Sequence, residues 1–258
     1  MISSVLNFIR KTIVIAELEL RKVLHDPTEI FMRAVQPTLW LLIFGQVFAR
    51  TRILPGPMNY LDFMAPGILC QSVLFVSIFF GIAIIWERDL GLTQKFLATP
   101  TPRTALVLGK ALSAGLRALP IAVFVYVLAW LLHVHVDWNP LHLAGVLLML
   151  FLGAISFSTL SLIIACIVKT RERFMGIGQL LTMPLFFASN AIYPIALMPP
   201  WLQVVSHVNP LTYMINAMRA LMIQGSDYQG LPKDFGILLL VSFVFVMIGG
   251  ALYRRVIV

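Results

Sequence analysis

The stretch FMAPGILCQSVLFVSIFFGIAIIW, residues 63–86, contains no charged side chain. A helix over this stretch would be about 36 Å long, enough to cross the roughly 30 Å hydrocarbon core of a bilayer. The whole chain of 258 residues is 60% hydrophobic and 12% charged, with a mean hydropathy of +0.92, whereas a soluble domain carries about 25% charged residues. We therefore predict an integral membrane protein. A soluble enzyme, a disordered chain and, with two cysteines, a disulfide scaffold are excluded.

Five further apolar stretches predict membrane spans, so the expected fold is all-α, with six transmembrane helices in a single domain over residues 1–258. The predicted spans cover about residues 29–49, 62–86, 105–132, 141–168, 174–190 and 235–253. Before them, apolar residues at helical spacing predict an amphipathic interfacial helix over residues 1–25. Its apolar face would hold Leu6, Ile9, Ile13, Ala16 and Leu20.

The segment from Phe174 to Met218 has no acidic or basic side chain other than histidine, and no charged loop divides it into two spans. It is interrupted by Pro184, Pro194, Pro199, Pro200 and Pro210. We therefore predict a re-entrant helical hairpin between spans five and six, in an extracellular segment over residues 191–224. Its helices are expected at Pro200–Ser206 and Pro210–Ile223, with Asn209 capping the second. Re-entrant backbone needs protein or water around it, which predicts a place on a transport pathway.

Basic residues are divided unevenly between the two sides of this topology. One side holds 15 of the 19 lysines and arginines, in the N-terminal segment, the 87–117 region, the 169–173 loop and the C-terminus. Because basic loops stay in the cytosol, we predict a multi-pass protein of the inner (plasma) membrane with both termini cytosolic. This clustering between apolar runs accounts for the net charge of +8, and we expect no binding to nucleic acid.

The chain lacks a phosphate-binding loop, because Gly109-Lys110 is followed by Ala111. We expect it to carry no catalytic residue and no cofactor of its own. No Asp or Glu falls in the middle of a predicted span, which argues against a carrier driven by protons or sodium ions. Energy must then come from a partner. The cytosolic coupling region 87–103, with apolar Phe96-Leu97 among charged residues, has the character of a docking helix.

Two other classes of function remain open. His133, His135 and Asp137 alternate and would share one face of an extended segment, where they could hold a metal ion. We expect no metal site there, since short polar connections are common. These residues are nevertheless the feature that would support an integral membrane lipid-modifying enzyme. The other open class is an assembly subunit without a transport pathway.

Two separated motifs resemble the signature of type-2 ABC transporter permeases, in the branch of drug and nodulation-factor exporters. The first is Glu87-Arg88, then Gly91-Leu92-Thr93-Gln94-Lys95-Phe96-Leu97-Ala98-Thr99-Pro100, Arg103 and Leu108-Gly109-Lys110. The second is Tyr193-Pro194, Leu197-Met198-Pro199-Pro200-Trp201, Asn209-Pro210-Leu211-Thr212-Tyr213 and Arg219-Ala220-Leu221. The resemblance extends from about residue 10 to residue 253. Gln94 departs from it, because the family often has Glu there.

The resemblance implies a homodimer bound to two copies of a separate cytosolic ABC ATPase, which would hold the ATP and Mg²⁺. The 1–25 helix would lie at the inner leaflet against that ATPase. The ATPase would be coupled through Glu87, Arg88, Asp89, Gln94, Lys95, Phe96, Leu97, Thr99, Pro100, Arg103, Lys169, Arg171 and Arg173. The re-entrant hairpin would form the extracellular gate with Tyr193, Pro194, Pro200, Trp201, Asn209, Pro210, Tyr213 and Arg219.

The resemblance also implies export, and the apolar character of the spans predicts an amphiphilic or hydrophobic cargo such as a drug, a lipid or a glycolipid. Polar anchors for a hydrophilic solute are scarce. The candidate pathway wall consists of Phe75, Phe79, Phe80, Phe186 and Phe187. Export of a polysaccharide or a lipid-linked glycan, which the same family performs, remains the alternative.

Overall fold

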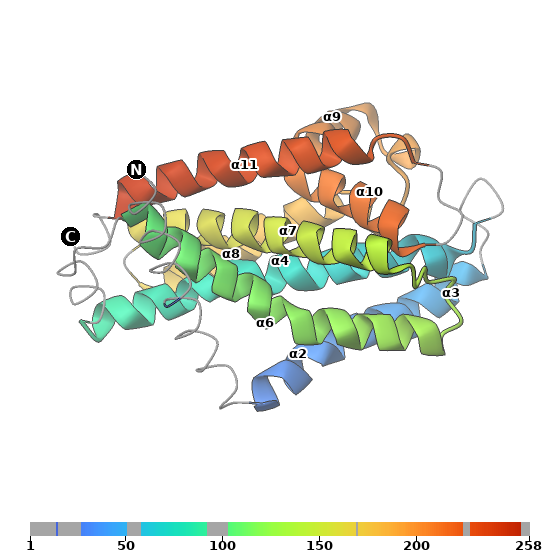
Figure 1. Ribbon diagram of the computed structural model, residues 1–258, viewed down its shortest axis with the longest axis horizontal. Coiled ribbons are helices and arrows are strands. Elements are labelled where there is room, and N and C mark those ends of the chain that lie inside the picture. The colour runs from blue at the N-terminus through green and yellow to red at the C-terminus, as the bar shows by residue number, and fades with distance from the viewer. Residues whose placement is uncertain are drawn as a thin grey trace.

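The computed structural model describes residues 27–50, 58–91, 103–168, 170–223 and 228–253, together with Val14. These residues form an elongated bundle of helices (Figure 1). In chain order they are α2 (Pro27–Leu39), η1 (Trp40–Gly45), α3 (Gln46–Ala49), α4 (Tyr60–Asp89), α6 (Arg103–Leu131), α7 (Pro140–Ile167), α8 (Arg171–Phe187), η2 (Ile195–Leu197), α9 (Pro200–Val208), α10 (Pro210–Met222) and α11 (Leu231–Leu252). The predicted interfacial helix over residues 1–25 lies outside the described residues except for Val14, and so does the stretch 92–102.

Helices α4 and α7 form the centre of the bundle. Helix α7 packs against α4, α6, α10 and α11, and α4 also packs against α2, α6, α8 and α10. Nearly every residue of α4 from Tyr60 to Glu87 is buried. Helix α7 is apolar on all sides, which is the pattern of a helix surrounded by other helices or by lipid. In Figure 1, α7 lies between α11 and α6.

Among the described residues, four helices are long and apolar enough to cross a membrane: α4, residues Thr104–Leu131 of α6, α7 and α11. They coincide with the predicted second, third, fourth and sixth spans. The predicted first span is helical from Pro27 to Ala49, with a π-helical segment at Trp40–Gly45 after Pro37. Proline has no N–H for the helical ladder, which accounts for irregular helix in its neighbourhood.

The predicted fifth span corresponds to α8, which ends at Phe187 rather than at residue 190. The side-chain amide of Asn209 donates to the carbonyl oxygens of Leu185 and Ala188, at 2.7 and 3.3 Å. These bonds satisfy carbonyl groups at the end of the helix, so no further helical turn is needed there. A residue distant in sequence therefore contributes to the boundary.

Both short helices predicted after the fifth span are present as α9 and α10. Each begins with a proline, whose missing N–H has no intrahelical partner to lose at the first helical position. The side chain of Asn209 accepts the N–H of Leu211 at 3.0 Å and caps α10 as expected. Helix α10 packs against α4, α7 and α11, whereas α9 exposes Trp201 and Val208.

Replacing Gly67 by Ala tests the close approach of α4 to the turn that follows α8. A Cβ atom at Gly67 would lie 2.6 Å from the carbonyl oxygen of Ala191 and 2.8 Å from its Cα. Because backbone must shift to relieve this overlap, we expect Gly67→Ala to lower the free energy of unfolding by about 1–3 kcal/mol. Thermal unfolding of the detergent-solubilised protein, followed by circular dichroism, measures the change.

Gly176→Ala in α8 is the matched control, because nothing lies within 4 Å of the added Cβ. Alanine is also a better helix former than glycine, so this variant should be as stable as the parent or slightly more stable. An equal loss of stability in both variants would contradict the packing argument.

Candidate functional site

The three charged residues at the end of α4 each contact a different part of the bundle. Glu87 pairs with the ammonium group of Lys110 in α6. Arg88 donates to the carbonyl oxygen of Val168, just after α7, at 3.2 Å. Asp89 accepts from the guanidinium of Arg171 in α8 at 2.8 Å. These five side chains, Glu87, Arg88, Asp89, Lys110 and Arg171, are named the end cluster, and they join α4 to α6, α7 and α8.

The end cluster has a buried part and an exposed part. The side chains of Glu87 and Lys110 are 7% and 2% exposed, and charges so deeply buried are tolerated when they are paired. Arg171 is a third exposed and lies over the ring of Trp86, with 3.5 Å between its guanidinium carbon and the ring centroid. The end cluster thus consists of the buried pair Glu87 and Lys110 beside the partly exposed pair Asp89 and Arg171.

The structure brings Glu87, Arg88, Asp89 and Arg171 together from the predicted coupling set. Glu87 faces the protein interior, so it can position a docking surface but is not exposed on one. Arg173 is exposed in the first turn of α8, and Arg103 begins α6. The other predicted coupling residues lie outside the described residues: Gln94, Lys95, Phe96, Leu97, Thr99, Pro100 and Lys169.

Sequence reasoning missed Lys110 as the partner of Glu87. The signal was available, because Lys110 is a cation within the otherwise apolar stretch 105–116. A buried charge requires a partner of opposite sign. The sequence could not identify that partner, because its identity depends on how α4 and α6 are aligned.

Several predicted gate residues form hydrogen bonds within the other half of the bundle, and we name Tyr193, Asn209, Tyr213 and Arg219 the outer network. Arg219 donates to the carbonyl oxygens of Phe63 and Asn190, at 3.2 and 2.8 Å. Its guanidinium carbon also lies 3.9 Å from the centroid of the Phe63 ring. These contacts attach α10 to α4 and to the turn that follows α8.

The two tyrosines of the outer network bind nearby carbonyl groups. The Tyr193 hydroxyl donates to Phe187 at 2.6 Å, and the Tyr213 hydroxyl donates to His207. Among the remaining predicted gate residues, Pro194 precedes η2, while Pro200 and Pro210 begin α9 and α10. Trp201 is exposed on α9 and stands apart from the network.

The alternating residues His133, His135 and Asp137 do not converge on one point. His135 pairs with Asp62 at 2.9 Å, whereas Asp137 pairs with His142 at 2.6 Å. The backbone N–H of Asn139 and the His142 ring hold the pKa of Asp137 below its usual value. No group of three His, Cys, Asp or Glu within the described part of the chain is arranged to hold a metal ion.

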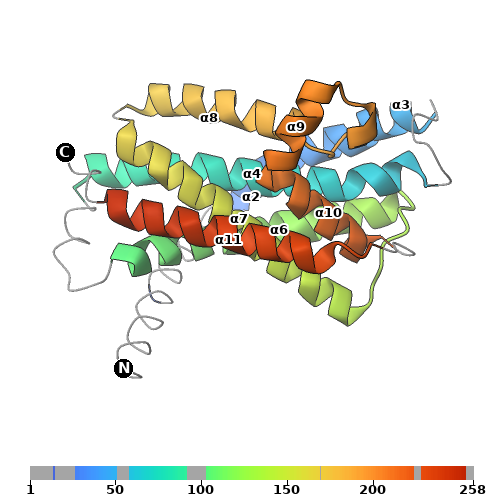
Figure 2. The same cartoon turned by 90° about the horizontal axis from the view of Figure 1, so that it is seen from above.

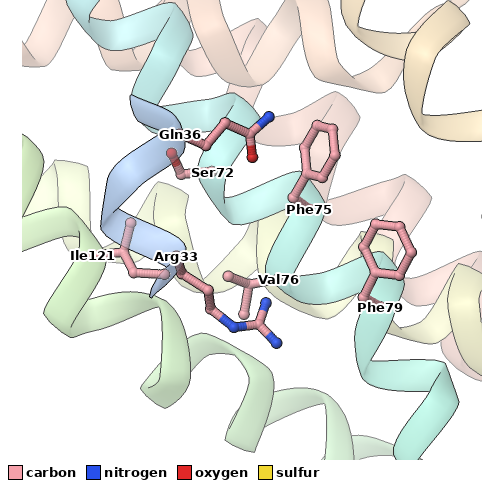
Figure 3. A pocket seen from close by; sticks show the side chains of 7 residues that line it. All are labelled: Arg33, Gln36, Ser72, Phe75, Val76, Phe79 and Ile121. Atoms are coloured by element: carbon pink, nitrogen blue, oxygen red, sulfur yellow. The ribbon is translucent and has the colours of Figure 1, made fainter. Parts of the chain in front are cut away.

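A pocket of about 160 Å³ lies between α2, α4 and α6 (Figure 3). Its lining residues are Arg33, Gln36, Ser72, Phe75, Val76, Phe79 and Ile121. Phe75 and Phe79 belong to the predicted pathway wall, and their stacked rings have centroids 6.0 Å apart. The lining therefore combines an aromatic wall with a cation, an amide and a hydroxyl group.

The other three phenylalanines of the predicted wall lie elsewhere. Phe80 is buried beneath the guanidinium of Arg117, and Phe186 is buried with its ring centroid 5.7 Å from that of Trp40. Phe187 is exposed on α8. Sequence reasoning also missed Arg33, Gln36 and Ser72 as pocket residues. The sequence offered a signal for them: Arg33 and Gln36 are polar residues at helical spacing in one apolar stretch, and Ser72 is a polar residue in another.

Replacing Lys110 by Met tests the buried ion pair. This change removes the cation that neutralises Glu87, and we expect it to lower the free energy of unfolding by about 3–5 kcal/mol. The double variant Glu87→Leu/Lys110→Met should be more stable than Lys110→Met alone, because it removes both buried charges. Thermal unfolding of the parent, both single variants and the double variant measures the coupling. Additive effects of the two substitutions would contradict a direct interaction.

Comparison with known proteins gives a family match over residues 10–223, to the ABC-2 type transporter. A transport permease named ycf38 from Cyanophora paradoxa is 27% identical over 96% of this chain and 89% of its own length. The daunorubicin resistance ABC transporter permease protein DrrB1 from Streptomyces coeruleorubidus is 26% identical over 90% of this chain and 80% of its own length. The inner membrane transport permease YadH from Escherichia coli K12 is 27% identical over 91% of this chain and 92% of its own length.

The matched region contains the end cluster, the outer network and the pocket. It extends over most of the chain, and the three relatives named above are all described as permeases. The chain therefore belongs to the ABC-2 type transporter family, as a membrane permease subunit.

Proposed function

We propose that this chain is the six-span subunit of an ATP-driven exporter and works as a homodimer with two copies of a cytosolic ABC ATPase. Permeases of the ABC-2 family work with ATPase subunits, which would bind the ATP and Mg²⁺. The end cluster is the observation that carries the proposal. Because the last turn of α4 is bonded to α6, α7 and α8, a force applied there would act on four helices together.

The positions of the acidic residues support an external source of energy. In the described helices α4, α6, α7, α8 and α11, acidic residues occur only in the terminal turns: Asp62, Glu87, Asp89, Glu172 and Asp234. A carrier driven by ions usually needs an ionisable group near the middle of the membrane. ATP hydrolysis on a partner chain supplies the energy without one.

The distribution of basic residues supports placing the end cluster in the cytosol. Arg88, Lys110, Arg171 and Arg173 lie at this end, whereas Arg50, Arg219 and Lys233 lie toward the other end, where Figure 2 shows α3 and the start of α11. By the positive-inside rule, both termini are then cytosolic, and the 191–224 segment is extracellular. The protein would occupy the inner (plasma) membrane.

The mechanism follows from this placement. Closure of the two ATPase subunits around ATP would push the end cluster, and α4 would carry the displacement to the outer network. Arg219 holds both Phe63 of α4 and Asn190 of the turn after α8, so movement of α4 would shift α9 and α10. These two helices would act as the extracellular gate. The cargo would be an amphiphilic or hydrophobic compound, and the drug-resistance name of the DrrB1 relative supports this class.

The first experiment is co-purification of the tagged chain in mild detergent with its ATPase. We expect the ATPase to be retained by the parent chain, and its apparent affinity to fall by about tenfold or more in Phe96→Ala/Arg173→Glu, because docking energy concentrates in a few contact residues. Lys233→Glu is the matched control, since Lys233 is exposed at the other end of the bundle. Failure of any ATPase to bind the parent chain, after co-expression or reconstitution, would contradict the proposal.

The surface of α8 supports a second copy as the dimer partner. Only Phe174, Gly178, Thr182 and Phe186 are buried, in one stripe at every fourth residue. Exposed apolar side chains continue onto η1, whose Trp40 ring contacts Phe186. Gln179 is exposed at the middle of α8. A polar side chain at that depth is more favourable against protein than against lipid.

Cross-linking at Gln179 tests the homodimer. In a Cys70→Ala/Cys166→Ala background, we expect Gln179→Cys to form a covalent dimer with a short bismaleimide reagent in membranes. Leu240→Cys is the control, because Leu240 is exposed on α11 and Figure 2 shows α4 between α8 and α11. No dimer at position 179, or equal dimer at both positions, would contradict this interface.

A further inference from the structure

We propose that the pocket between α2, α4 and α6 binds the anionic headgroup of an amphiphile that enters from the inner leaflet. Arg33 supplies the positive charge, and the rings of Phe75 and Phe79 hold the adjoining apolar part. Only the assignment to the inner leaflet rests on the proposed function. The binding site itself stands on the geometry of the pocket.

Two helical faces meet at this pocket. Arg33 and Gln36 are three residues apart on α2, and Ser72, Phe75, Val76 and Phe79 follow one stripe of α4. Figure 3 shows the side chains of Arg33 and Gln36 extending from α2 toward the side of α4 that carries both rings. Ile121 of α6 closes the opposite wall. The polar and aromatic groups therefore share one cavity.

The polar groups of the pocket favour an anion. The seven lining residues include one cation and no acidic side chain. A guanidinium matches the planar geometry of a carboxylate or phosphate and binds it through two N–H groups. The amide of Gln36 offers a further donor. The hydroxyl of Ser72 already donates to the carbonyl oxygen of Ile68 at 2.9 Å, so its oxygen can only accept a hydrogen bond from a ligand.

The pocket lies near the middle of the bundle, because Phe75 and Val76 are at the midpoint of α4 and Ile121 is 18 residues after the start of α6. Arg33 is six residues after the start of α2, and Phe79 is ten residues before the end of α4. These separations correspond to about 9 and 15 Å along a helix. With the end cluster in the cytosol, Arg33 and Phe79 form the side of the pocket that is nearer the inner leaflet. Basic pockets between transmembrane helices suit anionic lipid headgroups.

The size of the pocket limits what it can enclose. A volume of about 160 Å³ corresponds to only a few water molecules at roughly 30 Å³ each. It admits a phosphate or carboxylate group with a few carbon atoms, but not a whole lipid. Phe75 and Phe79 are half-buried, so their outer faces are available to an apolar chain that continues into the membrane. An amphiphile with a compact anionic head fits both features.

Lipid binding to the purified full-length chain tests the proposal without any ATPase. Fluorescence titration in an uncharged detergent would compare phosphatidylglycerol and phosphatidylcholine carrying the same fluorescent acyl chain. We expect the parent chain to bind phosphatidylglycerol about tenfold more tightly, as a charge-assisted contact predicts. Arg33→Gln should abolish this preference, and Arg33→Lys should retain most of it.

Gln36→Glu provides a second variant that keeps the shape of the side chain and places an anion in the pocket. It should also abolish the preference for phosphatidylglycerol. Phe79→Ala should weaken binding of both lipids and leave their ratio unchanged. Arg50→Gln is the matched charge control, because Arg50 is exposed beyond the other end of the same helical segment. It should bind both lipids as the parent does.

Three results would overturn the proposal: equal affinity of the parent chain for both lipids, an unchanged preference in Arg33→Gln and Gln36→Glu, or the same loss in Arg50→Gln. Displacement of phosphatidylglycerol by millimolar inorganic phosphate would assign the pocket to free anions instead of amphiphiles. Because no ATPase takes part, failure of ATPase docking leaves these results unaffected. Failure of lipid selectivity likewise leaves the permease proposal in place.

Discussion

Most of helix α4 between Tyr60 and Glu87 is buried by other helices, and the arrangement of the bundle depends on that burial. A helix surrounded by protein must match its neighbours in shape as well as in polarity. Gly67 admits the backbone at Ala191, and the hydroxyl of Ser161 in α7 binds the carbonyl oxygen of Ile78. The helices around α4 are placed by such contacts, and α4 forms the axis between the two ends of the bundle.

Buried charges determine how α4 is held at these ends. Removing a charge from water costs several kcal/mol unless an opposite charge or hydrogen bonds replace the water. Glu87 and Lys110 neutralise each other at one end. Toward the other end, Arg219 donates hydrogen bonds to the carbonyl oxygens of Phe63 and Asn190. Each contact allows little freedom of geometry. The helix is thereby attached to α6 at one end and to α10 toward the other.

The sequence anticipated the helices better than the grouping of their side chains. Apolar runs, Asn209 and the helix-initiating prolines are local signals, and the structure has helices where they predict them. The five phenylalanines of the predicted wall were grouped by residue type and by span. The structure separates them, because a shift of one residue along a helix turns a side chain by about 100°. Phe75 and Phe79 share a face of α4, while Phe80 points to Arg117.

The sequence by itself determined that the chain is helical and apolar enough for a membrane, where the helices of the described residues begin and end to within a few residues, and which family it resembles. These properties depend on composition and on short motifs. The tertiary structure alone decided that Glu87 turns inward to Lys110, that Asn209 terminates α8, and that Arg33 meets Phe75 and Phe79 in one pocket. Each of these joins residues from different helices, and the relative rotation and alignment of two helices is not encoded in either one alone.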